Sequence, residues 1–185
     1  MLVRNLVLAT AIFLVTFILG MLVAQESAEQ IMKQLGELLK PLRPVGNLSM
    51  LFLLFIFANN AIKALGAVLF GVLLGLPPLL FISLNGFILG GVVSAVKSLK
   101  GVEYVIASLV PHGVVEIPML LLATALGLTV GLESFKWLMR RESRVKSQLS
   151  TCLKLYLRWV LPGLAVAALI EVFVTPFLVR IVAGG

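Results

Sequence analysis

Cysteine and histidine each occur once in this chain, and charged residues make up only 12% of it. A soluble domain is usually about a quarter charged. The single Cys152 excludes an intrachain disulfide and a cysteine-based metal cage. The chain also lacks the G-x-x-x-x-G-K phosphate loop and the H-E-x-x-H pattern of zinc proteases. We therefore expect no cofactor, no catalytic residues and no enzymatic activity.

Apolar residues, in contrast, are abundant. They make up 61% of the 185 residues, and the mean hydropathy is +1.14. This composition predicts a multi-pass protein of the cell membrane, with the lipid bilayer as its surroundings. The net charge of +7 does not indicate nucleic-acid binding, because many of the basic residues crowd into one loop. Anionic lipid headgroups and membrane topology explain such a loop.

The apolar residues form five runs of about the length needed to cross a bilayer. We predict an all-α fold, in which residues 1–185 form a single transmembrane domain, a bundle of five helices. The first run is expected to be an uncleaved span rather than a signal peptide. The predicted spans are Leu6–Ala24, Leu48–Leu76, Leu79–Val96, Val105–Gly131 and Leu155–Arg180.

Two connecting segments have amphipathic patterns. Gln25–Lys40 has apolar residues at helical spacing between charged ones, and Glu133–Lys154 is rich in lysine and arginine. We predict that both form helices on the membrane surface, the second anchored by Trp137. Partner binding is the alternative for the first. Because basic residues concentrate in the second segment, we expect the N-terminus to be cytoplasmic.

The shorter connections are marked by proline and charge. Pro77-Pro78 predicts a tight reversal between the second and third spans, because the residue before a proline avoids the helical conformation. Lys97–Glu103 is expected to be a short polar loop.

Several polar residues nevertheless lie within the predicted spans, where an ionised side chain costs some kcal/mol. Two interpretations stay open. Lys63 could neutralise Glu116 or Glu171 and serve structure alone, or His112 and Glu116 could titrate or hold a ligand. The full polar set is Asn59, Asn60, Lys63, Asn85, His112, Glu116 and Glu171.

The fourth span contains the strongest candidate site. His112 and Glu116 are four residues apart, so a helix places them on one face. Pro111 and Pro118 flank them, which favours a kink and a non-helical or re-entrant piece before Pro111. His112 and Glu116 are candidate metal ligands, but two ligands do not complete a zinc site. A further ligand would have to come from Asn59, Asn60, Asn85 or Glu171.

Glycines spaced four apart predict close packing of helix backbones. Most are expected to pack within the bundle, and a homodimer seam is the alternative. They are Gly71, Gly75, Gly86, Gly90, Gly127 and Gly131.

These residues together resemble the stage II sporulation protein M family, whose members have five spans. The resemblance covers about residues 48–131, and the remaining chain agrees in span count. It is carried by Asn59-Asn60, Gly66, Gly71, Gly75-Leu76-Pro77, Asn85-Gly86, Gly90 and the run Leu109-Val110-Pro111-His112-Gly113-Val114-Val115-Glu116. In endospore-forming bacteria the resemblance implies a membrane scaffold that acts with peptidoglycan-degrading partners.

The first hypothesis for this chain is therefore a non-enzymatic membrane scaffold or complex subunit, with membrane or surface proteins as partners. The second is a small transporter or ion-coupled permease that uses His112 and Glu116, with Asn59, Asn60 and Asn85 lining the same midplane site. The third and weakest is an intramembrane metal-dependent enzyme.

Overall fold

The computed structural model describes residues 1–24 and 50–184, and these residues form helices without any strand. Five helices are long and apolar enough to cross a membrane, which confirms the predicted all-α bundle. They are α1 (Leu2–Val23); α3 (Met50–Leu69) with the 3₁₀ turn η3 (Phe70–Val72); α4 (Leu76–Lys100); α5 (Val102–Leu138); and a last helix composed of α6 (Val145–Leu155), η4 (Tyr156–Val160), α7 (Leu161–Leu169), η5 (Ile170–Val174) and α8 (Thr175–Val182).

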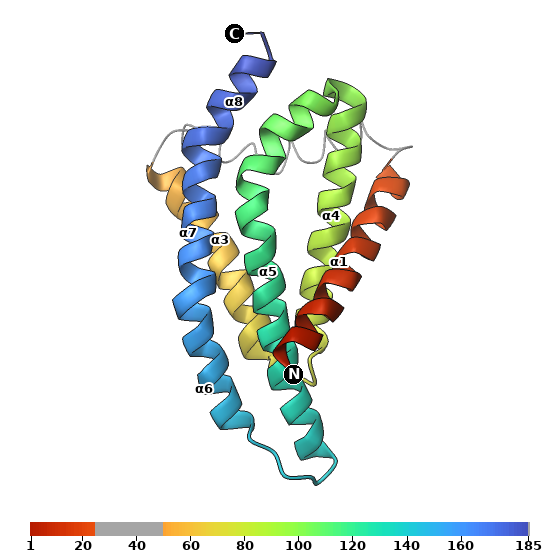
Figure 1. Ribbon diagram of the computed structural model, residues 1–185, viewed down its shortest axis with the longest axis vertical. Helices are drawn as coiled ribbons and strands as arrows, with labels where there is room; N and C mark the ends of the chain where they lie inside the picture. Colours follow the sequence, from red (N-terminus) through yellow and green to blue (C-terminus); the bar gives the residue numbers. More distant parts are fainter. Residues whose placement is uncertain (25–49, 185) are drawn as a thin grey trace.

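Helix α5 is the central element of the bundle. It contacts α1 and α4 on one side and α3 and the last helix on the other (Figure 1). Its second half is buried almost continuously, from Ala123 to Gly131, and many of these residues are small. Small side chains allow neighbouring backbones to approach closely in a medium where lipid offers no hydrophobic drive for association.

The prediction of a non-helical or re-entrant piece before Pro111 was wrong. Helix α5 runs unbroken from Val102, with Pro111 and Pro118 inside it. The first part of α5, drawn in green, leans across toward α4 (Figure 1). A proline inside a helix removes one backbone hydrogen bond and clashes with the preceding turn, so bending is the expected response.

The short connections also differ from the prediction. The chain reverses at Leu73–Gly75, before the two prolines, because Gly75 adopts a left-handed conformation at φ +79°. Its N–H donates to the Gly71 carbonyl at 2.9 Å. Pro77 and Pro78 instead lie in the first turn of α4, where a missing N–H costs nothing.

The predicted polar loop Lys97–Glu103 is reduced to Gly101. Helix α4 continues to Lys100 and α5 begins at Val102, with Gly101 at φ +89° between them. Glycine adopts a positive φ at little cost, so Gly101 ends one helix and allows the next to begin without a longer loop.

The predicted surface helix over residues 133–154 was also wrong. Helix α5 ends at Leu138, and α6 continues directly into the last span. The buried carboxylate of Glu133, in the last turns of α5, accepts a hydrogen bond from the Arg144 backbone N–H at 3.0 Å and one from Lys136. The other predicted surface helix, Gln25–Lys40, lies outside the described residues.

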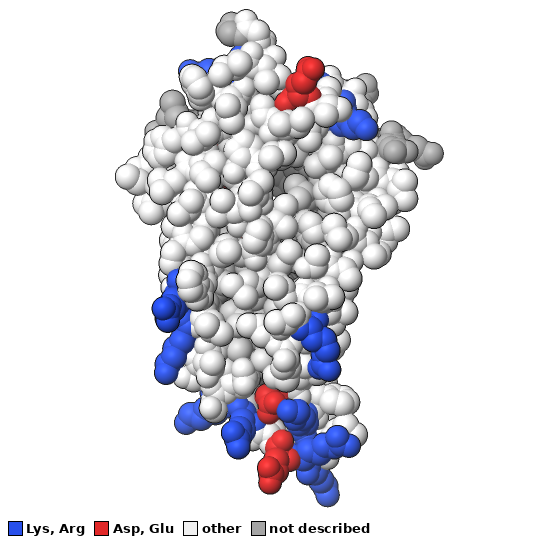
Figure 2. All heavy atoms as spheres, in the orientation of Figure 1, with Lys and Arg blue, Asp and Glu red and all other residues white. Residues whose placement is uncertain are grey.

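Charge separates the molecule into an apolar band and two ends (Figure 2). Lysines and arginines gather at the end that holds the connection between α5 and α6, and the start of α1 lies toward the same end. Among residues 1–24 and 50–184, few charges lie at the opposite end, where α4 joins α5. The apolar band between the ends matches the setting expected of a membrane bundle.

Candidate functional site

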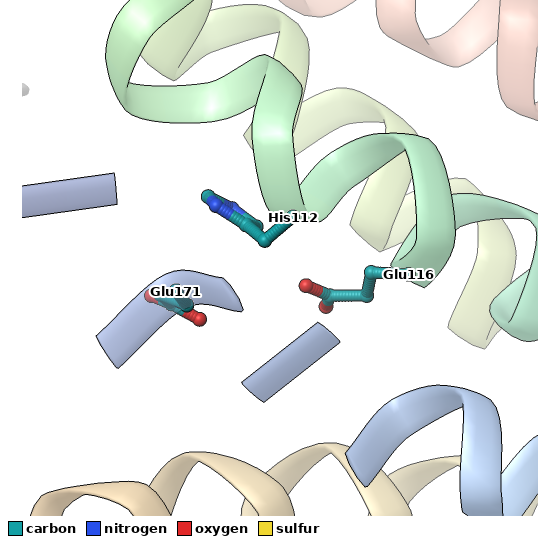
Figure 3. Close-up of side chains that lie close together, drawn as sticks. All are labelled: His112, Glu116 and Glu171. Atoms are coloured by element: carbon teal, nitrogen blue, oxygen red, sulfur yellow. The ribbon is translucent and has the colours of Figure 1, made fainter. Parts of the chain in front are cut away.

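His112, Glu116 and Glu171 converge within the bundle. One ligand atom from each of these side chains lies within 4.8 Å of the others. His112 and Glu116 project from one face of α5 toward Glu171 on the last helix (Figure 3). All three residues are half-buried. Two carboxylates and an imidazole thus meet at a helix seam, although Glu171 is 55 residues from Glu116 in the chain.

Glu171 approaches from an irregular part of the last helix. It belongs to the π-helical turn η5, and Pro176 follows two residues after that turn. The turn η4 has the same relation to Pro162. Since proline cannot donate to the preceding turn, a locally widened helix accommodates it. Single π-helical turns occur frequently at functional sites.

Further polar residues surround the three side chains. The Asn60 amide donates to Glu116 Oε1 at 3.0 Å, and the Asn59 amide donates to Asn60 Oδ1 at 3.3 Å. The Thr175 hydroxyl lies 3.5 Å from His112 Nδ1. The polar network therefore joins α3, α5 and the last helix. Thr175 was missed in the sequence, although it follows Glu171 by four residues and so shares its helical face.

Two predicted members of the polar set make no direct hydrogen bond or ion pair with this network. Asn85 donates to the Phe81 carbonyl of its own helix at 2.7 Å. Lys63, on α3, is exposed. Among the residues that the structure describes, no ion pair within 4.0 Å joins Lys63 to Glu116 or Glu171. The predicted ion pair between Lys63 and a glutamate of the site is therefore not formed.

The six predicted packing glycines lie at close approaches between backbones of the same chain. A Cβ atom at Gly71 would collide with the Gly127 backbone, and one at Gly131 would collide with the Gly75 backbone. On the other side of the bundle, a Cβ at Gly86 would meet the Phe13 carbonyl at 2.7 Å, and one at Gly90 would collide with the Phe17 carbonyl. These glycines are therefore occupied by contacts within the bundle.

Between the site and the basic end, the bundle interior is filled mainly by apolar side chains, with Thr124 and Thr129 also buried. The following apolar residues are at most 1% exposed and belong to a single cluster: Ala64, Val68, Leu126, Val130, Val160 and Leu164. Tyr156 belongs to the same cluster, and its hydroxyl donates a hydrogen bond to the Ala61 carbonyl at 2.7 Å. Sequence reasoning did not find this bond, because nothing in a local pattern pairs residues 95 positions apart.

One comparison with known proteins identifies the family of this chain. The family model described as stage II sporulation protein M matches residues 9–176. Comparisons with curated proteins and with solved structures returned no match. The matched range includes the His112 and Glu116 run, the asparagine pair and Glu171. The chain, a multi-pass helical membrane protein, therefore belongs to the stage II sporulation protein M family.

Proposed function

We propose that this protein is a non-enzymatic membrane scaffold, a subunit that holds partner proteins at the cell membrane. The proposal rests on the filled apolar interior between the polar site and the basic end. A permease must expose its site alternately to both sides of the membrane. Here α3, α5 and the last helix meet on one side of the site through fully buried aliphatic side chains and touching glycine backbones.

The basic end is the surface that we assign to partner binding. Trp137, Leu138 and Met139 are exposed there beside Arg140 and Arg141. Exposed aromatic, methionine and arginine side chains are typical of protein interfaces. In this proposal the basic end and the N-terminus face the cytoplasm, in accordance with the positive-inside rule. The partner is a membrane or surface protein with an acidic face.

The test combines crosslinking with a flux assay. A photo-reactive amino acid is placed at Arg141 in cells of the source organism, with a matched control at exposed Leu99 near the opposite end. We expect a discrete heterologous crosslink at position 141 and not at position 99. The purified chain in proteoliposomes is expected to carry Mn²⁺ or Zn²⁺ no faster than empty vesicles.

A second function, cation-coupled transport, is favoured by the convergence of His112, Glu116 and Glu171. Flux above that of empty vesicles would establish it, provided that Glu116→Gln abolishes the flux with helix content unchanged. That result, or the absence of any heterologous crosslink at position 141, would overturn the scaffold proposal.

A further inference from the structure

We propose that His112, Glu116 and Glu171 form a binding site for one divalent transition-metal ion, which joins α5 to the last helix. This inference goes beyond the scaffold function and does not depend on it. Its basis is the convergence of three ligand atoms within 4.8 Å, from two helices that are distant in sequence.

The types of donor atom select the class of ion. An imidazole nitrogen suits zinc, iron, nickel and copper, whereas carboxylate oxygens also suit manganese. Calcium and magnesium prefer oxygen donors alone, and Cu(I) prefers thiolate or thioether ligands. One nitrogen and two carboxylates therefore favour Zn²⁺, Fe²⁺, Mn²⁺ or Co²⁺. Three protein ligands would leave a coordination position for water or another group.

The geometry is close to that of a bound state. Donors about 2.1 Å from a tetrahedral zinc ion lie about 3.4 Å from one another. Atoms that already lie within 4.8 Å reach this arrangement through small side-chain rotations. His112 and Glu116 share a face of α5 because they are one helical turn apart, so only Glu171 must come from another element.

The charges also balance. Two ionised carboxylates and a neutral imidazole carry a charge of −2, which a divalent ion cancels. Isolated charges are costly in a bundle surrounded by lipid, and two adjacent carboxylates repel each other. Lys63 does not relieve this repulsion by a direct ion pair with either glutamate, and a cation between the carboxylates would do so.

The surrounding contacts resemble the outer shell of a metal site. Asn60 donates to one oxygen of Glu116, which leaves the other oxygen for an ion. Thr175 lies beside one ring nitrogen of His112, and the second nitrogen is then the ligand. Hydrogen bonds of this kind orient ligating carboxylates and imidazoles.

A groove of about 420 Å³ lies between the first part of α5 and α8, and its lining includes Glu103, Pro111 and Leu178. Pro111 directly precedes His112, and Leu178 follows Thr175 by three residues. The groove thus lies near the end of the bundle, and its lining includes none of the three ligands.

The test uses Co²⁺ as the probe, because its visible absorption bands report coordination number and donor type. The full chain is purified in detergent, its affinity tag is removed, and metal is stripped before titration. We expect about one Co²⁺ per chain at saturation. His112→Gln, Glu116→Gln and Glu171→Gln should each weaken binding about 100-fold, whereas Glu103→Gln, a carboxylate outside the cluster, should leave it unchanged.

A second variant separates metal binding from a structural role. Glu171→His supplies an imidazole nitrogen at a reach similar to that of the carboxylate, so this variant should still bind Co²⁺, with its visible bands shifted to shorter wavelength by the stronger nitrogen donor. Failure of the folded wild-type chain to bind Co²⁺ would overturn the proposal. So would binding that Glu171→Gln leaves undiminished, or a Glu171→His variant that binds Co²⁺ with unshifted visible bands.

Discussion

Two seams of this bundle are built in different ways. Helices α1 and α4 meet through Gly20, Gly86 and Gly90, each so close to the opposing backbone that a Cβ atom would collide. Helix α5 and the last helix meet through half-buried polar side chains, a π-helical turn and a groove. The first seam has no space for a ligand at its glycines, and the second has donor groups that converge from two helices.

The difference indicates that one seam fixes the packing of the helices and the other carries the polar groups that could bind a ligand. Glycine contacts fix helix positions through the backbone and contribute no chemistry. Polar groups at a helix seam cost free energy in lipid, so they need partners within the bundle or a bound cation. Stability and ligand binding should therefore respond to substitutions in different seams, and four predictions test this division.

The largest effect is expected from Gly90→Leu in the α1–α4 seam. The added side chain would collide with the Phe17 carbonyl and approach the Met21 backbone nitrogen, and a backbone cannot rotate away as a side chain can. We expect a loss of about 3 kcal/mol or more in the free energy of unfolding. Far-UV circular dichroism during denaturation in detergent measures it.

The matched control is Gly66→Ala, where the nearest atoms to a new Cβ are Phe70 side-chain carbons at 3.8 Å. Here we expect no loss, and up to about 1 kcal/mol of gain from helix propensity. Equal losses at the two glycines would contradict the assignment of close packing to the α1–α4 seam.

The second effect concerns the metal proposed for the polar seam. A ligand that binds only the folded chain stabilises it by about 2.7 kcal/mol at a hundred times its dissociation constant. Saturating Co²⁺ should therefore raise the midpoint of thermal unfolding of the wild-type chain and leave that of Glu171→Gln unchanged. An equal rise in both proteins would indicate nonspecific binding.

A smaller effect is expected from Tyr156→Phe. The Tyr156 hydroxyl is buried and donates to the Ala61 carbonyl, which joins α3 to the last helix. We expect a loss of about 1 kcal/mol, because the carbonyl loses a buried partner. Tyr104→Phe is the control, since that hydroxyl accepts only an exposed bond from Lys100 and should matter less. The reverse order would refute the role assigned to Tyr156.

The smallest effect is expected from Thr10→Val in α1. The Thr10 hydroxyl donates to the Leu6 carbonyl one turn earlier in the same helix, so it joins no two elements. The change in the free energy of unfolding should stay within about 0.5 kcal/mol. A loss approaching that of Gly90→Leu would show that polar contacts, and not glycines alone, stabilise the α1–α4 seam.

Sequence patterns predicted the helical spans well and their ends poorly. Long apolar runs and glycines four apart depend on local chemistry, so they could be read directly. The reversal before α4 depends on the left-handed Gly75, where the prediction placed the turn at Pro77-Pro78. The end of α4 depends on Gly101, where the prediction was a short polar loop over Lys97–Glu103. The proline pair lies in the first turn of α4 and not in the reversal. Proline is compatible with both positions, so the sequence alone did not distinguish them.

The sequence by itself determined that this chain is a five-span helical bundle and that His112 and Glu116 share one face of a helix. Hydropathy and helical periodicity are local properties, and they suffice for both conclusions. Only the tertiary structure decided that Glu171 and Asn60 complete the polar site, while Lys63 and Asn85 make no direct hydrogen bond or ion pair with it. Contacts between spans depend on how each helix rotates about its axis, and packing against the other helices sets that rotation.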